Sequence, residues 1–129
     1  MRMLFIAAAL IATTATPAIA RERLTGEQQL QKLLKGHTPG KPVECISLGR
    51  SQDSTTIDQT AIVYHDGDTL YVNRFNGGCP ELRDDRILVT RTPSTRLCRG
   101  DIARIMERPP SIMVGTCSFD SFTPYKRVR

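Results

Sequence analysis

The fold of this chain is decided by residues 61–75, which read AIVYHDGDTLYVNRF. Two runs rich in β-branched and aromatic residues flank the pair Asp66-Gly67. This pattern predicts a β-hairpin. Because glycine tolerates positive φ, the Asp-Gly pair favours a two-residue type I′ turn, which would place His65 opposite Asp68.

The predicted register sorts the apolar residues of this hairpin onto two faces. The expected cross-strand pairs are Ala61 with Val72, Ile62 with Tyr71, and Val63 with Leu70. Since successive side chains of a strand point to opposite faces, the pairs with Val72 and Leu70 share the better core face. The second face would hold Ile62, Tyr64 and Tyr71. We expect the N-terminal helix to cover this second face, or the face to line a pocket.

Short strands separated by turns continue from residue 43 to the end of the chain. The candidates are residues 44–48, 55–58, 87–90, 112–114 and 118–122. The run 101–107 fits either helix or strand, and we interpret it as a strand because it is short and lies between Gly100 and Pro109. The sequence therefore predicts a mainly β fold, a small antiparallel barrel or sandwich with one short N-terminal helix.

The short helix is predicted after residue 24. Thr25 is the expected N-cap, and Gln28 three residues later completes a capping-box pattern. The apolar stripe consists of Leu30, Leu33 and Leu34. Gly36 is the expected stop, and residues 37–42, with two prolines and a glycine, are the expected connector.

The N-terminus has the order of a secretory signal sequence. Arg2 precedes an apolar run at 3–12, and Ala18 and Ala20 are the small residues of a cleavage site after Ala20. The run is shorter than the ~20 residues of a spanning helix. We therefore expect three parts: a signal peptide at 1–20, a helix and connector at 21–42, and a disulfide-bonded β domain at 43–129. The mature protein would be periplasmic or secreted, with no membrane span.

Four cysteines lie in the predicted mature chain, namely Cys45, Cys79, Cys98 and Cys117. An even number in a small exported domain indicates disulfides, and four cysteines allow three pairings. We favour Cys79–Cys98 with Cys45–Cys117, which would pin the middle of the domain and tie its ends. Their wide spacing does not suit a zinc site, and a Cys-x-x-Cys redox motif is absent from the sequence.

The surroundings of the cysteines resemble a family of small exported bacterial proteins classed as a domain of unknown function. The shared pattern is Cys45-Ile46, Cys79-Pro80-Glu81-Leu82, Leu97-Cys98-Arg99-Gly100-Asp101 and Gly115-Thr116-Cys117, with Phe122 and Pro124 after it. The resemblance covers roughly residues 43–124. It implies export and one compact domain, and it brings no catalytic residues.

The sequence offers little catalytic chemistry. The two histidines are His37 and His65, and His65 lies beside Asp66 and Asp68. A weak cation site at this turn competes with the simpler interpretation that aspartate is a good turn residue. A Gly-x-Ser-x-Gly elbow and the standard phosphate-binding glycine loops are absent from the sequence. We expect no cofactor and no enzyme; the alternative is a small periplasmic enzyme whose site is dispersed along the chain.

Arginines are abundant in the second half of the chain. Seven of them lie within residues 83–108, namely Arg83, Arg86, Arg91, Arg96, Arg99, Arg104 and Arg108. Formal net charge is +5 for the whole chain, and Trp is absent. Nucleic-acid binding usually adds stacking aromatics, so we expect no nucleic acid. The candidate partners are an anionic envelope polymer or another periplasmic protein. The leading function is a non-enzymatic envelope-associated binding or structural module; an inhibitor of a secreted hydrolase, acting through residues 76–85, is a further alternative. The tripeptide Arg99-Gly100-Asp101 is interpreted as a turn braced by Asp101.

Overall fold

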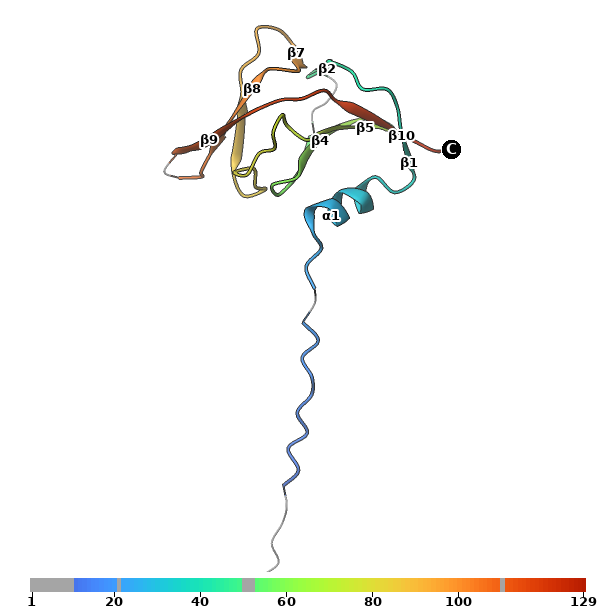
Figure 1. The fold of residues 1–129 in the computed structure, drawn as a ribbon, viewed down its shortest axis with the longest axis vertical. Helices are drawn as coiled ribbons and strands as arrows, with labels where there is room; N and C mark the ends of the chain where they lie inside the picture. The colour runs from blue at the N-terminus through green and yellow to red at the C-terminus, as the bar shows by residue number, and fades with distance from the viewer. Residues whose placement is uncertain (1–10, 21, 50–52, 110) are drawn as a thin grey trace, which may run out of the picture.

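The mainly β prediction is confirmed by a computed structural model, which describes residues 11–20, 22–49, 53–109 and 111–129. These residues form ten strands in three antiparallel sheets and one short helix (Figure 1). The predicted signal peptide rests largely on residues 1–10, which lie outside the described residues. Residues 11–20 are exposed and form neither helix nor strand.

Three sheets and the helix make up the architecture. The helix is α1 (Gly26–Leu33). The strands are β1 (His37–Pro39), β2 (Cys45–Ser47), β3 (Asp53–Ile57), β4 (Ala61–Asp66), β5 (Thr69–Asn73), β6 (Ile87–Thr90), β7 (Arg96–Cys98), β8 (Ile102–Met106), β9 (Met113–Ser118) and β10 (Thr123–Arg127). The strand orders are β1-β10-β5-β4-β3, β2-β7 and β6-β8-β9. The ambiguous run 101–107 is thus a strand, as we interpreted it.

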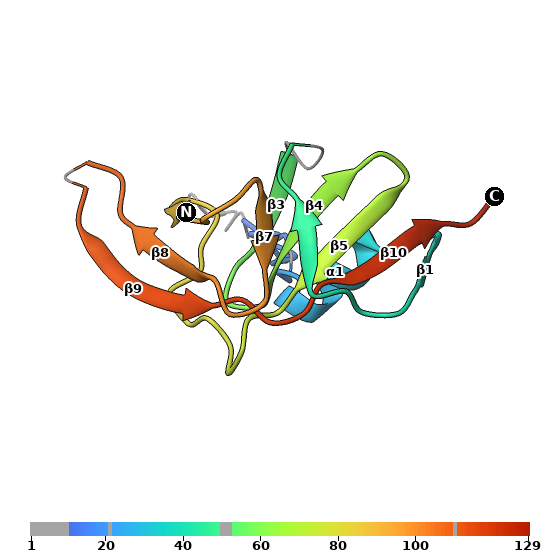
Figure 2. The same ribbon diagram turned by 90° about the horizontal axis from the view of Figure 1, so that it is seen from above.

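The elements lie in three layers, with the five-stranded sheet in the middle. Helix α1 packs on one face of this sheet, and the two smaller sheets cover the other (Figures 1 and 2). In the described residues the sheets do not close into a barrel, so of the two predicted architectures the sandwich-like one fits.

The turn of the central hairpin differs from the prediction. Asp66 pairs with Thr69, so the two loop residues are Gly67 and Asp68 instead of Asp66 and Gly67. Gly67 has a φ of +56°, whereas Asp68 does not have a positive φ. Glycine at the first central position is typical of a type II′ turn, which is the other two-residue turn that matches strand twist.

This change shifts every predicted pair of the hairpin by two residues along β5. Val63 lies opposite Val72 instead of Leu70. Because side chains alternate with a period of two, an even shift leaves each residue on its predicted face. The predicted register is therefore wrong, and the predicted division into two faces is confirmed.

The helix covers the opposite face from the one we expected. Leu30 is buried with Ala61, Val63, Leu70 and Val72, which belong to the first face of the hairpin. The second face, with Ile62 and Tyr64, packs instead on the two smaller sheets. The core there is largely aromatic and contains Tyr64, Phe75, Phe119 and Phe122. The prediction that the helix covers the second face is therefore wrong, because Leu30 of the helix packs on the first face of the hairpin.

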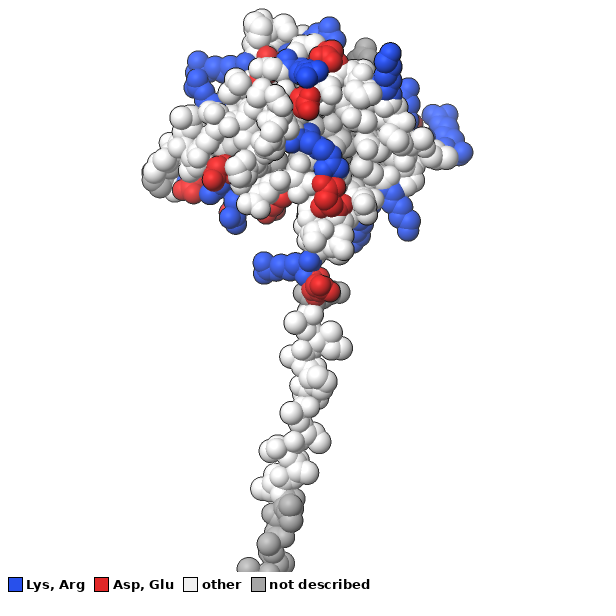
Figure 3. Space-filling view, in the orientation of Figure 1, with Lys and Arg blue, Asp and Glu red and all other residues white. Residues whose placement is uncertain are grey.

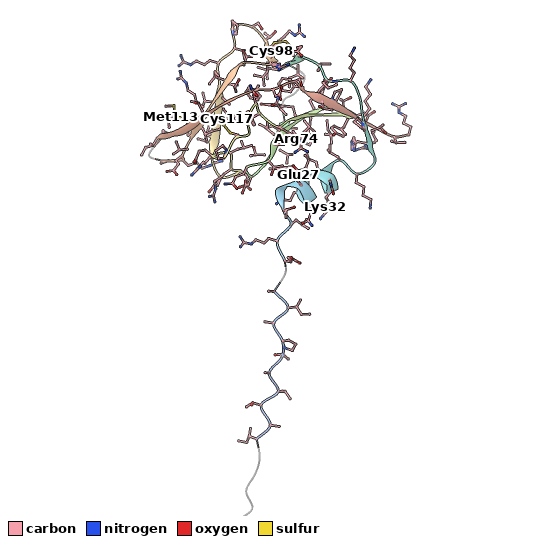
Figure 4. All side chains as sticks on the ribbon, viewed as in Figure 1. Glu27, Lys32, Arg74, Cys98, Met113 and Cys117 are labelled. Carbon is pink, nitrogen blue, oxygen red and sulfur yellow. A yellow bond between two sulfur atoms is a disulfide. The ribbon has the colours of Figure 1, made fainter. Side chains whose placement is uncertain are left out.

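The predicted capping of α1 is confirmed. The Thr25 hydroxyl accepts from the Gln28 N–H at 3.2 Å, and the Gln28 side chain accepts from the Thr25 N–H at 2.9 Å. Glu27 in the first turn forms a bidentate pair with Arg74, which follows β5 (Figure 4). The hydrogen bond from Arg74 lowers the pKa of Glu27. This pair fastens the helix to the central sheet.

Both disulfides differ from our favoured pairing. Cys45 is bonded to Cys98, and Cys79 is bonded to Cys117. Cys45 and Cys98 are direct cross-strand partners in β2 and β7. Cys117 lies in β9, and its bond anchors the loop that follows β5 (Figure 4). The favoured pairing is wrong because β2 pairs with β7, which brings Cys45 to Cys98, while the loop after β5 brings Cys79 to Cys117 in β9.

Two strands lie where the sequence indicated a connector and a chain end. β1 occupies the first half of the predicted connector 37–42 and pairs with β10. β10 contains Pro124, which we placed beyond the last strand. The missing N–H of this proline costs no bond to β5, because Pro124 directs its carbonyl toward the β1 side, where it accepts from the Gly40 N–H at 2.7 Å.

Candidate binding site: an arginine pocket on the three-stranded sheet

The sheet β6-β8-β9 has one buried face and one face open to solvent. Ala103 and Ile105 of β8 are buried in the core, whereas Ile102 and Arg104 are exposed. Cross-strand partners share a face of the sheet. Val89, the partner of Arg104, therefore lies on the open side. We call this side the outer face.

A shallow pocket of about 320 Å³ lies at one end of the outer face. Its lining residues are Val89, Arg91, Gly100, Asp101, Ile102 and Arg104. We call it the arginine pocket. Its walls are supplied by β6, by β8 and by the turn between β7 and β8, so the sheet register fixes its shape.

Two arginines are diagonal neighbours in this pocket. Arg104 is paired with Val89, and Arg91 lies two residues farther along the same chain segment. Diagonal neighbours on one face of a sheet are ~7–8 Å apart, within reach of long side chains. Neither arginine forms an ion pair with any residue in the part of the chain that the structure describes. The pocket therefore concentrates positive charge that the protein itself does not neutralise.

Asp101 also lines the pocket, but in the described residues its carboxylate forms no ion pair with either arginine. Its Oδ2 accepts a hydrogen bond from the backbone N–H of Cys98 at 2.8 Å. The Asp101 N–H in turn donates to the Cys98 carbonyl at 3.1 Å, and Gly100 between them has a φ of +89°. The Arg-Gly-Asp tripeptide is thus a turn braced by its aspartate, as the sequence predicted. Its carboxylate is used for local structure.

A second arginine-rich pocket is, by contrast, compensated. It is lined by Arg83, Asp85, Arg86, Glu107 and Arg108. Arg86 binds the Glu81 carboxylate and also Glu107 at 3.3 Å, while Arg83 lies 3.4 Å from Asp85. The hydrogen bond to Glu81 raises the pKa of Arg86. The number of arginines therefore does not distinguish the two pockets. They differ in ion pairing, because Arg83 and Arg86 bind carboxylates whereas Arg91 and Arg104 form no ion pair in the described chain.

The two histidines lie away from the arginine pocket. His65 on β4 is hydrogen-bonded to the Thr55 hydroxyl at 2.8 Å, and His37 lies 3.2 Å from the Lys35 carbonyl oxygen. Asp66 follows His65 directly in β4, so the two side chains point to opposite faces of the sheet. Across the described ranges, no group of three histidine, cysteine or acidic side chains is arranged to hold a metal ion. The geometry thus does not bring together the His65, Asp66 and Asp68 side chains.

The loop at 76–85 protrudes from the domain, as Figure 2 shows for the yellow segment after β5. Its anchors include the Cys79–Cys117 disulfide and the hydrogen bond from the Asn76 N–H to the Ser118 carbonyl at 2.9 Å. The Leu82 carbonyl also accepts from the Gln59 N–H at 2.8 Å. Its first residues after Asn76 are Gly77 and Gly78, which carry no side chain. The loop is therefore anchored, but Gly77 and Gly78 provide no side chains that a partner could recognise.

The sequence reasoning included Arg91 and Arg104 among seven arginines without distinguishing them. It also missed the exposed apolar residues of the outer face. Ile87 is 42 % exposed, Ile102 is 49 % exposed and Met113 is 55 % exposed. One signal was available for the apolar surface: β6 reads ILVT, which alternation of faces cannot bury completely.

Fold and site together define a small, disulfide-bonded, mainly β protein with an arginine pocket on a sheet face that also exposes apolar residues. Along the described parts of the chain, no helix has the length and apolar character needed to span a membrane. The chain matches no protein-family model, no curated protein and no solved structure.

Proposed function

We propose that this protein is an exported, non-enzymatic binding module of the bacterial envelope, and that it binds an anionic envelope polymer through the arginine pocket. The observation that carries the proposal is the pair Arg91 and Arg104, which line one pocket and form no ion pair with any described residue. Two guanidinium groups on neighbouring strands repel one another. A bound anion removes this repulsion and gains charge-assisted hydrogen bonds.

Arginine is well suited to this task. Its planar guanidinium matches the geometry of carboxylate and phosphate groups, with which it forms bidentate hydrogen bonds. Both arginines are exposed and therefore accessible to a large ligand. A shallow pocket admits one charged group of a polymer at a time, and the neighbouring repeats extend over the surface.

Export is supported by two independent features of the chain. The N-terminal sequence has the pattern of a cleavable signal, and disulfides such as the two described here persist in oxidising compartments. The resemblance to small exported bacterial proteins agrees with both. We therefore propose a periplasmic or secreted location, with residues 21–129 as the mature protein.

Binding is preferred to catalysis because the carboxylate that lines the arginine pocket is engaged in local structure. Asp101 is the acidic residue that lines the pocket, and its carboxylate already accepts from the Cys98 N–H. Neither His37 nor His65 contributes to the pocket. General acid–base catalysis requires such a group within hydrogen-bond reach of the substrate.

The test is a titration of the exported protein with deacylated bacterial lipopolysaccharide, a soluble saccharide that carries phosphate and carboxylate groups. We expect binding that weakens with salt, and no binding to neutral dextran. The double variant Arg91→Glu/Arg104→Glu should lose at least tenfold in affinity. The matched control Lys32→Glu/Lys35→Glu, which makes the same change of charge in α1 and in the turn after it, should stay within twofold. Equal losses in both variants would show a general charge effect and would contradict the proposal.

The protruding loop supports a second candidate, inhibition of a secreted hydrolase. Its anchoring by the Cys79–Cys117 disulfide is the kind of rigid support that such a loop needs. Incubation of the protein with a panel of secreted proteases and glycosidases tests this candidate. Inhibition that disappears when Pro80 and Glu81 are replaced by glycine would favour it over polymer binding.

A further inference from the structure

The outer face changes in character along its strands. The arginine pocket lies toward one end, with Arg104 at its centre. Toward the other end, Ile87, Met106 and Met113 are cross-strand partners and form a row across all three strands. Met113 is 55 % exposed. We call these three residues the apolar end.

The basic and apolar ends lie at a defined spacing. Met106 follows Arg104 by two residues of β8, and Ile87 precedes Arg91 by four residues. With a rise of ~3.3 Å per residue, the two ends are roughly 7–13 Å apart along the strands. One ligand of moderate size can therefore contact both ends at once.

The apolar end is not covered by another part of the described chain. Ile87 and Met113 are 42 % and 55 % exposed. Strand β9, which reads MVGTCS, carries no charge, and the surface over it in Figure 3 is mostly uncharged. Figure 4 places Met113 toward the outer end of β9, far from Glu27 and Arg74. Contiguous exposed apolar surface of this kind marks a contact site.

A purely saccharide polymer does not use such a surface. Its hydroxyl and anionic groups prefer polar partners, and an exposed row of isoleucine and methionine offers none. An acyl chain, in contrast, is the natural partner of this row, because methionine side chains adapt to flexible apolar ligands. The charge at one end and the apolar row at the other thus complement a molecule with an anionic head and an acyl chain.

Resting on the proposed function, we infer that the anionic polymer is acylated, an anionic glycolipid. Its charged group binds at Arg91 and Arg104, and an acyl chain lies along Ile87, Met106 and Met113. The outer face is then a single amphipathic site, and the arginine pocket is its polar half.

The experiment compares intact bacterial lipopolysaccharide with the same material after deacylation, both immobilised at equal density. The exported protein should bind the intact glycolipid at least tenfold more tightly. In the variant Ile87→Ser/Met113→Ser, affinity for the intact glycolipid should fall to the wild-type value for the deacylated form. The control Leu24→Ser/Val128→Ser, which removes two exposed apolar side chains elsewhere, should bind both ligands as the wild type does. Thermal unfolding by circular dichroism checks that each variant is folded.

The outcomes separate this inference from the proposed function. Equal affinity for intact and deacylated material overturns the acyl-chain contact and leaves polymer binding in place, whereas absence of binding to either ligand overturns both. Equally tight binding to phosphatidylglycerol vesicles would assign the face to a membrane surface instead of a glycolipid. A dimer that dissociates in Ile87→Ser/Met113→Ser, with unchanged glycolipid affinity, would assign the apolar end to contact between copies.

Discussion

The buried side chain of Asn73 forms hydrogen bonds with both backbone groups of Asp120. Its Nδ2 donates to the Asp120 carbonyl at 2.6 Å, and its Oδ1 accepts from the Asp120 N–H at 3.2 Å. The same Oδ1 accepts from the Phe75 N–H at 3.0 Å. Asn73 is fully buried at the end of β5, and Asp120 lies in the connection between β9 and β10. One amide therefore joins the central sheet to the three-stranded sheet that carries the arginine pocket.

Replacement of this asparagine should destabilise the protein strongly. Asn73→Ala leaves the backbone groups of Asp120 and Phe75 buried without their partner, and such groups cost about 1–3 kcal/mol each. We expect the free energy of unfolding in urea to fall by about 3 kcal/mol. Asn76→Ala, at an exposed side chain three residues later, should change it by less than about 0.5 kcal/mol. Similar values for both variants would show that the Asn73 bonds contribute nothing beyond a surface amide.

The disulfide connectivity can be checked directly by mass spectrometry. Trypsin cleaves after arginines that separate the four cysteines, so a digest without reduction should give linked peptides for Cys45–Cys98 and Cys79–Cys117. Their sequence separations are 53 and 38 residues. On the chain-entropy argument, loss of either bond should lower the free energy of unfolding by about 4 kcal/mol. Peptides that link Cys45 to Cys117 would contradict the structure.

A methyl group at Gly26 should displace the start of the helix. A Cβ at this position would overlap the Thr60 hydroxyl and lie 2.9 Å from the Thr60 Cβ. Alanine favours helices, yet overpacking typically costs about 1–3 kcal/mol. We therefore expect Gly26→Ala to destabilise the protein, and Thr60→Ala to restore part of the loss in the double variant. Gly49→Ala serves as the control, because among the described residues the nearest atom to its Cβ would be the Ser47 hydroxyl oxygen at 3.9 Å. A stabilised Gly26→Ala protein would refute the predicted overlap.

Alkaline pH should destabilise the protein partly through Tyr64. Burial raises the pKa of this phenol above its ordinary value of 10.0. The unfolded chain therefore loses this proton first, so the stabilising contribution is complete below about pH 10 and is lost as the pH rises above it. The free energy of unfolding should fall between pH 9.5 and 11.5 more steeply in the wild type than in Tyr64→Phe. Identical slopes for the two proteins would count against a buried phenol.

Local features of the fold could be predicted from the sequence, whereas long-range pairings could not. The capping box of Thr25 and Gln28 involves neighbours in the chain, so its residues suffice to predict it. The two faces of the hairpin could be predicted from the alternation of side chains along a strand. A register error of two residues does not change which face a side chain lies on. The prediction of the turn was wrong because Gly67 can occupy either the first or the second central position of a two-residue turn. The packing of the whole sheet decides between these two registers.

Neither the disulfide pairing nor the arginine pocket could be predicted from the sequence, and the physical reason is the same for both. Cys45 meets Cys98 because β2 pairs with β7, and Arg91 meets Arg104 because β6 pairs with β8. Both pairings join strands that other elements separate in the sequence, and hydrophobic alternation does not state which strand lies beside which. Composition indicated arginine-rich chemistry, but the identity of the two uncompensated arginines depended on this topology.

The order of the disulfides has a consequence for how the chain matures. The first cysteine is bonded to the third and the second to the fourth. A polypeptide that emerges N-terminus first presents Cys45 and Cys79 before either native partner is accessible. Rapid oxidation at that stage joins two sulfurs that belong in different bonds, and only exchange with a free thiolate corrects the error. We therefore expect co-expression of a disulfide isomerase to raise the yield of this protein in an oxidising compartment.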